Sequence, residues 1–454
     1  MIDDLLRKLR AGFDGGRTRP IAWRREQLAA VKELVAGNEK TWLEALREDL
    51  GKSTYEAFGA EIGYVAKEAD FARRHLARWM RPRKVATPLI AQPGTSYIVP
   101  EPRGVVLIIG AWNYPLQLTM APLIAAIAAG NAAIVKPSEV AAATSAQLAE
   151  LLPEYLDAEC FAVVEGGVPE TSALLEQRFD HILYTGGERV ARIVMSAAAK
   201  HLTPITLELG GKSPCYVDRE VDLDVAASRI AWGKFMNAGQ TCIAPDYVLV
   251  HRAVARELTQ ALGRRIREFY GDDPAASGDY PRIINERHFD RLTALLDGQS
   301  IVHGGRHDRT TRYVEPTLVR EPDPQSPLMQ EEIFGPILPI VTVDDAEAAI
   351  HFIRERPQPL ALYAFASERD VQDRIVDRVS AGSVCVNDTM MFMAAPGLPF
   401  GGVGASGMGR YSGWFGFETM SHMKAVMRRG TRLDPDLRYP PYTERKLRVL
   451  RWLS

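Results

Sequence analysis

The sequence is poor in the residue patterns that build metal centres and disulfide frameworks. Its four cysteines form no CxxC pair, and its nine histidines show neither an HxxxH pattern nor a mixed Cys/His spacing. The 55 basic and 57 acidic residues nearly balance, so no excess of one sign attracts nucleic acid. We therefore expect no metal, no nucleic-acid partner, a small-molecule ligand and a reducing, cytoplasmic compartment.

Long hydrophobic runs are also missing. The segment closest to a membrane span, "LTMAPLIAAIAAGNAAIV" at 118–135, is interrupted by a proline, a glycine and an asparagine, which favours a buried helix followed by a buried strand. The charged N-terminus, "MIDDLLRKLRAGFDGG", lacks the apolar core of a signal peptide. We expect no transmembrane segment. For the basic C-terminal segment, "RYPPYTERKLRVLRWLS", we favour a docked tail over a segment that meets a membrane surface or a partner groove.

The length and the pattern of the chain predict more than one domain. A chain of 454 residues, 46% of them hydrophobic, is too long for a single core. Residues 1–80 have helical periodicity, and residues 85–104, with prolines and β-branched residues, are typical of an exposed hairpin. Beyond residue 104, five short apolar strands alternate with four helices, which predicts a parallel, doubly wound sheet. The strands are expected in "GVVLIIG" (104–110), "AAIVK" (132–136), "FAVVEGG" (161–167), "HILYTGG" (181–187) and "PITLELGG" (204–211).

The second half of the chain repeats this style and predicts a second α/β domain. The boundary is expected near 209–215, and strands are expected in "DYVLVH", "PILPIVTV", "ALYAFAS" and "SVCVND". A glycine-rich coil at 398–413 ends this domain, and the segment 417–427 is expected to supply a last strand.

Polar residues and glycines follow the predicted strands of the first domain. Each has a structural interpretation by itself, as a helix cap, a turn or a solvated charge. Together they favour a site, because ligands of such sheets bind beyond the carboxyl ends of the strands. These residues are Asn113, Lys136, the glycine pairs at 166–167 and 186–187, and Glu208.

Two motifs resemble nucleotide-binding loops, but the residues and predicted elements around them do not fit such loops. "GVGASG" (402–407) matches GxGxxG, but it follows no clear strand and opens no helix. "GGKS" (210–213) resembles the end of a phosphate loop, but Thr206 stands where the first glycine is needed. Neither motif supports nucleoside triphosphate chemistry.

Cys242 is a candidate nucleophile. A lone cysteine is more often a small core residue, and that interpretation holds for Cys160, Cys215 and Cys385. The residues before Cys242, "AGQT", form a turn that can aim backbone amides at the sulfur, lower its pKa and keep it reachable. From the residues alone both interpretations of Cys242 stay open.

Nearly the whole chain resembles the aldehyde dehydrogenase family, in particular its class 3 members. The blocks "GAWNYPLQLTMAPLIAAIAAGNAAIVKPSE", "LTPITLELGGKSPC", "FMNAGQTCIAPDYVL", "LMQEEIFGPILPI" and "LPFGGVGASGMGRYSG" stand in family order. The resemblance implies NAD(P)-dependent oxidation of an aldehyde to a carboxylic acid, with Cys242 as nucleophile, Glu208 as general base and Asn113 as oxyanion donor. It implies the family fold, with a Rossmann-type cofactor domain (1–84 and 103–208), an α/β catalytic domain (209–410) and small oligomerisation elements with a C-terminal tail (85–102 and 411–454).

The resemblance also implies a set of cofactor and substrate contacts. NAD is the expected cofactor with NADP tolerated, because a fixed Glu139 would repel a 2′-phosphate. One departure from the family concerns the turn after "YTGG", where Glu188, Arg189 and Ala191 replace a hydroxyl or amide and a further glycine; Arg189 is a candidate replacement contact for the pyrophosphate. The expected cofactor residues are Trp112, Lys136, Ser138, Glu139, Gly186, Gly187, Glu332 and Phe334, and the expected substrate residues are Tyr64 and Tyr114.

Substrate and assembly are less constrained. "MMFMAAPG" (390–397) would suit an apolar aldehyde, although methionines are as often simple packing. The family implies a homodimer. Two alternatives stay open beside hydrolytic oxidation: a relative that transfers the acyl group to CoA, and a non-catalytic homologue in which Cys242 is a core residue.

Overall fold

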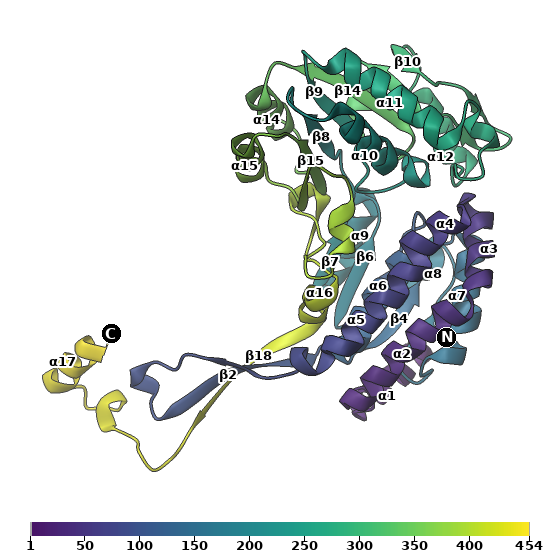
Figure 1. Ribbon diagram of the computed structural model, residues 1–454. Coiled ribbons are helices and arrows are strands. Elements are labelled where there is room, and N and C mark those ends of the chain that lie inside the picture. The colour runs from purple at the N-terminus through teal and green to yellow at the C-terminus, as the bar shows by residue number, and fades with distance from the viewer. Residues whose placement is uncertain (1, 454) are drawn as a thin grey trace.

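The computed structural model describes residues 2–453 and consists of two lobes and an arm. Figure 1 shows the N-terminal helices and the first sheet in the lower lobe, the green second sheet in the upper lobe, and an arm that ends in the yellow C-terminal helix. No helix among residues 2–453 is long and apolar enough to cross a membrane.

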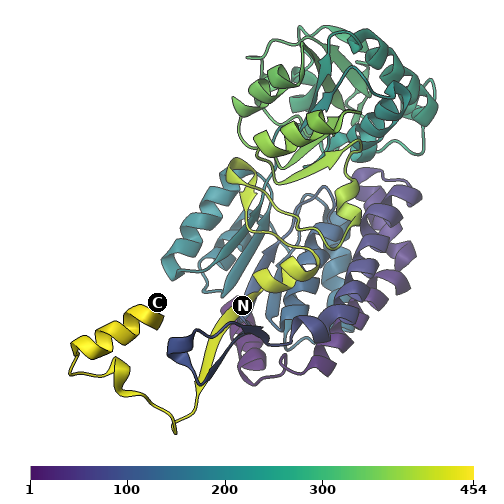
Figure 2. The same ribbon diagram turned by 60° about the vertical axis from the view of Figure 1, so that its left-hand side comes forward.

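The N-terminal segment is helical, as its periodicity predicts. Its apolar positions, such as Leu28, Val31 and Leu34, are fully buried. Figure 2 shows these helices on one side of the first sheet and the helices of residues 168–201 on the other. The N-terminal elements are α1 (Ile2–Asp14), α2 (Ile21–Gly37), α3 (Glu39–Leu50), α4 (Thr54–Ala57), the π-helical turn η1 (Phe58–Ile62) and α5 (Gly63–Trp79).

The first sheet has the order β17-β7-β6-β3-β4-β5. Its five predicted strands are confirmed and all run parallel: β3 (Val105–Ile109), β4 (Ala132–Lys136), β5 (Phe161–Val163), β6 (His181–Thr185) and β7 (Ile205–Glu208). The glycine-rich coil returns to this sheet, where β17 (Gly407–Met408) pairs antiparallel with β7. The connecting helices are α6 (Gln117–Ala129), α7 (Ala142–Tyr155), α8 (Val168–Leu175) and α9 (Glu188–His201).

Helix α6 is buried along its whole length and is capped at both ends by charges from the N-terminal helices. At its start, the Glu61 carboxylate accepts hydrogen bonds from the backbone amides of Leu116 (2.9 Å) and Gln117 (3.2 Å). At its end, Arg24 donates to the Ala128 carbonyl (3.0 Å), and Gly130 closes the helix at φ 87°. A carboxylate at the amino end and a cation at the carboxyl end both complement the helix dipole. Because α6 lacks capping side chains of its own, residues 2–79 complete it.

The upper lobe contains a seven-stranded sheet with the order β10-β13-β14-β9-β8-β15-β16. The four predicted strands are confirmed as β9 (Tyr247–His251), β14 (Ile337–Val343), β15 (Ala361–Phe365) and β16 (Ser383–Val386). The pattern missed β8 (Pro214–Val217), β10 (Ile301–His303) and β13 (Thr317–Arg320), each too short to show a period. Helices around it are α10 (Leu223–Phe235), α11 (Ala255–Tyr270), α12 (Glu286–Ala294), α13 (Pro327–Gln330), α14 (Ala346–Arg354) and α15 (Arg369–Arg378).

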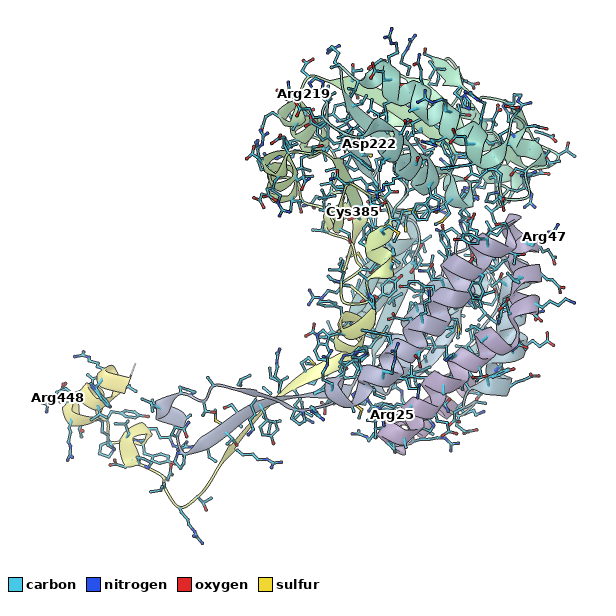
Figure 3. All side chains as sticks on the ribbon, in the orientation of Figure 1. Arg25, Arg47, Arg219, Asp222, Cys385 and Arg448 are labelled. Atoms are coloured by element: carbon cyan, nitrogen blue, oxygen red, sulfur yellow. The ribbon has the colours of Figure 1, made fainter. Side chains whose placement is uncertain are left out.

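The arm is a three-stranded antiparallel sheet. The predicted hairpin is confirmed as β1 (Arg83–Val85) and β2 (Gly94–Pro102), and β18 (Ser421–Arg429) pairs with β2. The last strand begins later than predicted, because Gly413–Thr419 forms the helix α16. At the tip, α17 (Glu444–Leu453), which carries Arg448, lies apart from both lobes (Figure 3). The C-terminal tail therefore does not dock on the lobes of its own chain, and the expectation of a docked tail is wrong in this respect.

Candidate active site

The two lobes bring opposite ends of their sheets together. In the first sheet, Asn113 follows β3, Lys136 ends β4, Gly186 follows β6 and Glu208 ends β7, on four adjacent strands. The predicted convergence at one sheet edge is therefore confirmed. The second sheet contributes from the amino ends of its strands: Cys242 precedes β9, and Glu332 and Phe334 precede its neighbour β14.

Cys242 stands after a turn of unusual backbone conformation. Asn237, Ala238 and Gly239 all have positive φ, at 52°, 50° and 73°. A Cβ on Gly239 would lie 2.2 Å from the Gly335 carbonyl oxygen, so only glycine fits there. Unlike the fully buried Cys215, Cys242 is partly accessible. Non-glycine residues held in the left-handed region are typical of functional sites.

The electrostatics of Cys242 differ from the expectation. Burial, followed by the charges of Glu332 and Glu208, raises the pKa of the Cys242 thiol above its ordinary value. Hydrogen bonds from the backbone amides of Cys242 and Ile243 act in the opposite direction but are the weaker influence. The turn does aim amides at the sulfur, whereas the predicted net lowering of its pKa is wrong, because burial and then the two carboxylates outweigh these amides.

Glu208 is a buried carboxylate without a partner. Its side chain is 3% exposed, and neither carboxylate oxygen accepts a hydrogen bond. Burial raises its pKa well above the ordinary value. Its backbone is fixed by a bond from the Gly186 amide to the Glu208 carbonyl (3.0 Å) and by the pairing of Gly407 opposite it. The structure thus holds a high-pKa carboxylate in place near the thiol, which suits a general base.

Glu332 is the second carboxylate beside Cys242. A Cβ on Gly210 would lie 2.1 Å from Glu332 Oε2, so the glycine pair before β8 makes room for this side chain. Burial and the charge of Asp246 raise the pKa of Glu332 to about 8, and its Oε1 has no partner. The segment is anchored by Asp246, which pairs with Lys212 (2.5 Å) and accepts from the Ile333 amide (3.1 Å).

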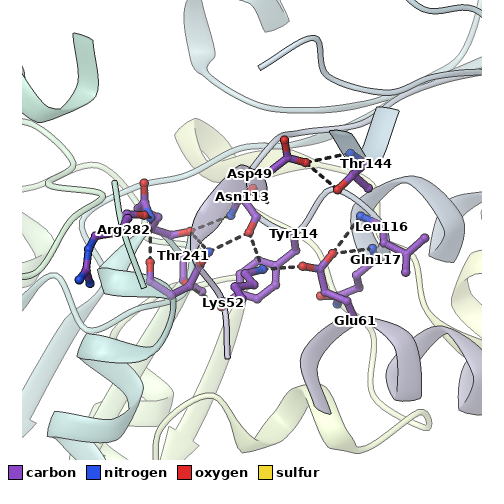
Figure 4. A network of polar contacts seen from close by, with 12 residues as sticks. Asp49, Lys52, Glu61, Asn113, Tyr114, Leu116, Gln117, Thr144, Thr241 and Arg282 are labelled. Atoms are coloured by element: carbon purple, nitrogen blue, oxygen red, sulfur yellow. Dashed lines mark hydrogen bonds and ion pairs between the residues drawn. The ribbon is translucent and has the colours of Figure 1, made fainter. Parts of the chain in front are cut away.

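Asn113 and Tyr114 belong to a polar network that reaches Thr241, the residue before Cys242 (Figure 4). The Asn113 side-chain amide donates to the Gln240 carbonyl (3.1 Å), and the Tyr114 hydroxyl bonds the Thr241 hydroxyl (2.8 Å). Both residues therefore contact the turn that precedes Cys242. Asn113 is 3% exposed and Tyr114 is 5% exposed, and the polar end of each side chain has a partner in that turn.

The remaining cofactor candidates follow β3 and β4 or precede β14. Lys136 Nζ contacts Glu139 Oε2 (3.0 Å), while Glu139 itself remains half exposed. The Trp112 and Phe334 rings meet edge to face at 5.2 Å, next to Glu332 with its orphaned Oε1. Ser138 is buried and accepts from the Val140 amide (3.3 Å). An unsatisfied buried oxygen beside two aromatic rings fits a ribose hydroxyl and a nicotinamide.

The turn at the start of α9 has open space around Gly187 and carries the charged residues Glu188 and Arg189, in which this chain departs from the family pattern. Gly187 has no atom within 4 Å of a Cβ built on it, so the approach to the amides of α9 is free. Glu188 pairs with Arg192 (2.5 Å), whereas the exposed Arg189 makes no hydrogen bond or ion pair with a described residue. Arg189 is thus the cation free to meet an anion at this turn.

Sequence reasoning missed two residues beside the site. Lys234 is fully buried, its Nζ has no hydrogen-bond partner, and burial lowers its pKa to about 8. Tyr411 is 1% exposed, its hydroxyl is unpartnered, and its surroundings include Tyr64, Glu208 and Cys242. Neither residue follows a predicted strand, so no local pattern marks it. Among residues 2–453, no group of three or more His, Cys, Asp or Glu side chains could hold a metal ion.

The chain is similar to known proteins over nearly its whole length. A model of the aldehyde dehydrogenase family matches residues 1–426. Aldehyde dehydrogenase family 3 member A2 of Mus musculus is 52% identical over 97% of this chain and 91% of that protein. The dimeric NADP-preferring aldehyde dehydrogenase of Rattus norvegicus is 49% identical over 97% of this chain and 98% of its own length. A solved substrate-bound state of AldH from Staphylococcus aureus gives a TM-score of 0.97 at 45% identity and covers 100% of both chains.

Proposed function

Because the chain belongs to the aldehyde dehydrogenase family and oxidises aldehydes to carboxylic acids with NAD(P), we propose that Cys242, Asn113 and Glu208 carry the reaction. The observation that supports this most is an accessible thiol whose turn contacts the Asn113 amide and whose pKa is affected by the unpartnered carboxylate of Glu208. All three come from segments that the two sheets hold rigidly.

The Cys242 thiolate adds to the aldehyde carbon, and the carbonyl oxygen becomes an oxyanion in a tetrahedral hemithioacetal. The backbone amides of Cys242 and Ile243 that face the sulfur, together with the Asn113 side-chain amide, stabilise this oxyanion. Bound NAD(P) supplies the acceptor for the hydride that leaves the carbon. The product on the protein is a thioester at Cys242.

Glu208 activates the water that hydrolyses this thioester. A base for water works best when its pKa lies near the working pH, and burial moves the Glu208 pKa in that direction. The orphaned carboxylate oxygens leave it free to accept the water proton. A CoA-acylating enzyme would have no need of such a base, so hydrolysis is the favoured outcome.

The cofactor is held by residues of both lobes. Lys136, Ser138 and Glu139 bind the adenosine ribose, Gly186 and Gly187 free the approach to the α9 amides, and Trp112, Glu332 and Phe334 enclose the nicotinamide riboside. We propose a preference for NAD, since a fixed Glu139 carboxylate would repel a 2′-phosphate. Equal turnover with NAD and NADP would contradict this preference.

The substrate is an apolar aldehyde. Tyr64 and Tyr114, with Tyr411 behind them, supply aromatic walls, and the methionines of 390–397 add apolar surface. We further propose a cytoplasmic homodimer, in which residues 85–102 and 411–454 provide the contacts between subunits. Residues 1–84 and 103–208 bind the cofactor and 209–410 carry the catalytic thiol.

One assay tests the reaction and its alternatives. Nicotinamide reduction is measured with a panel of aliphatic and aromatic aldehydes, with and without CoA, for the parent and for Cys242→Ala. We expect CoA-independent activity that falls on the order of 10⁴-fold or more in Cys242→Ala. Cys385→Ala is the matched control and keeps full activity. Activity that survives in Cys242→Ala would contradict the mechanism, and dependence on CoA would select the acyl-transfer alternative.

A further inference from the structure

Beneath Asn113 lies an ion pair that the reaction chemistry does not use. Lys52 and Glu61 are 2.5 Å apart, and both side chains are 0% exposed. We infer that this pair positions the oxyanion donor Asn113, by holding the backbone of the turn that carries it. The inference rests on the proposed role of Asn113.

Lys52 holds the turn through the carbonyl of Asn113. Its Nζ donates to the Asn113 carbonyl oxygen (3.0 Å) and stands 4.0 Å from the centre of the Tyr114 ring. An ammonium has three hydrogens, and here a carboxylate, a carbonyl and a ring face surround it. The ammonium therefore fixes two consecutive residues of the turn (Figure 4).

Glu61 holds the same turn three residues later. One oxygen pairs with Lys52, and the other accepts the amides of Leu116 and Gln117 at the start of α6. These amides have no partner within the helix, and a carboxylate at this end is favoured by the helix dipole. Lys52 and Glu61 thus hydrogen-bond to the backbone of this turn before and after Pro115, respectively.

The turn that carries Asn113 is also hydrogen-bonded directly to the loop before Cys242. The Asn113 carbonyl also accepts from the Asn237 side chain (2.8 Å), and the Asn113 amide donates to the Gln240 carbonyl (3.1 Å). Asn237 begins the run of three positive φ values before Cys242. A shift of the Asn113 backbone would therefore change the distance between the oxyanion donor and the sulfur.

Stability alone is a weak reason to bury this pair. Replacing a buried ion pair with apolar residues of similar volume is often neutral or stabilising, whereas removing one partner strands a charge. Positioning requires a fixed direction and distance, which an ammonium between a carboxylate and a carbonyl supplies and a methyl group does not.

The test is the double variant Lys52→Met/Glu61→Leu of the full chain, made in the parent and in Asn113→Ala. Because misplacing a catalytic group by about 1 Å costs on the order of 100-fold, we expect kcat to fall roughly 10- to 100-fold, with the KM for cofactor unchanged. In the Asn113→Ala background the same replacement is expected to cost less than about 3-fold, because the pair acts through Asn113.

Two results separate this inference from the proposed function. If Asn113→Ala alone keeps parental kcat, the role of Asn113 fails and the inference fails with it. If Asn113→Ala is impaired but the double variant loses the same factor in both backgrounds, only the positioning inference is overturned.

A matched control and a milder variant keep the test decisive. Asp49 is another buried carboxylate that caps a helix, accepting from the Ala143 (3.0 Å) and Thr144 (2.9 Å) amides of α7, so Asp49→Asn should lower Tm without lowering kcat at saturating cofactor. Should the double variant fail to fold, Lys52→Arg takes its place, because it keeps the charge while moving the donor away from Asn113. It is expected to lose kcat in the parent background only, and an equal loss in both backgrounds overturns the inference.

Discussion

Two groups of residues around Cys242 differ in whether their buried polar atoms have hydrogen-bond partners. One group surrounds Asn113, and the other contains Glu208 and Glu332. On the Asn113 side, the side chains of Lys52, Glu61, Asn113, Tyr114 and Gln240 leave no buried polar atom without a partner, whereas Asn237 leaves its Oδ1 unpartnered. On the other side, both oxygens of Glu208, one oxygen of Glu332 and the ammonium of Lys234 are unpartnered. Each such atom costs about 1–3 kcal/mol.

This difference indicates that the first group supports the site, whereas the second group takes part in binding and proton transfer. A satisfied buried network is rigid and holds one geometry. Unpartnered groups destabilise the fold, but they remain free to bind a water, a substrate or a ribose hydroxyl. The site therefore combines a rigid donor on one side with carboxylates ready to exchange protons on the other.

The largest expected effect comes from removing the charge of Glu208. Glu208→Gln should lower kcat about 10²- to 10⁴-fold, because the amide cannot accept a proton from water. The first turnover of nicotinamide reduction should stay fast, since only hydrolysis of the thioester needs the base. Rapid-mixing absorbance measurements would detect this burst, and a first turnover as slow as the steady state would contradict the assignment.

The same variant should be more stable than the parent. Because the Glu208 pKa is raised in the folded state, the folded protein binds this proton more tightly than the unfolded chain. Stability from this group therefore falls as pH rises above the ordinary glutamate pKa of 4.5. The Tm advantage of Glu208→Gln should grow between pH 5 and pH 8, and a constant difference would contradict burial of the charge.

Glu332 is expected to have a smaller effect on rate and a distinct effect on the thiol. Glu332→Gln should reduce kcat about 10-fold through looser cofactor contacts. It should also lower the pKa of Cys242, because Glu332 is the strongest charge acting on that thiol. Iodoacetamide alkylation against pH, in a Cys385→Ser background, measures the shift. Glu208→Gln serves as the comparison and should shift the thiol pKa less.

Arg189 extends the comparison to the cofactor side. Arg189→Ala should weaken cofactor binding about 3- to 10-fold, because an exposed cation at a helix start contributes modestly to anion binding. NADH fluorescence titration measures the dissociation constant without turnover. Lys200→Ala, near the end of the same helix, is the control and should bind normally. An unchanged dissociation constant in Arg189→Ala would remove the proposed pyrophosphate contact.

Lys234 is expected to affect stability more than activity. Because its pKa falls from 10.5 to about 8 on folding, the buried charge destabilises the protein at neutral pH, and this penalty fades as pH rises from 8 to 10.5. Lys234→Met should therefore raise Tm by about 2–4 °C at pH 7 and by little at pH 10.5. Calorimetry at both values tests this, and a lower Tm at pH 7 would mean that an unseen partner compensates the charge.

The sequence alone predicts most of the first sheet and its edge. Short apolar strands alternating with helices predict a parallel sheet, and this places Asn113, Lys136 and Glu208 at one edge. Cys242, Glu332 and Phe334 come from the amino ends of the second sheet, for which no general rule exists. The turn before Cys242 made it a candidate, and only the family resemblance decided for it and identified Glu332 and Phe334.

The local sequence pattern did not predict contacts between residues far apart in the chain. Lys52 and Glu61 are separated from Asn113 by about fifty residues or more. Lys52 lies in the coil between α3 and α4 and Glu61 in the turn η1, and the local pattern of neither segment indicates a contact with Asn113. The raised pKa of Cys242 depends first on burial and then on two carboxylates from different lobes. Such properties arise from packing, which a one-dimensional pattern does not encode.

The capping of α6 also bears on how the chain is made. Residues 2–79 leave the ribosome before α6, so Glu61 and Arg24 are already available when this buried, largely apolar helix emerges. Nascent apolar segments aggregate when they wait for late partners. Here the partners come first, and the order of synthesis protects the helix on which Asn113 depends.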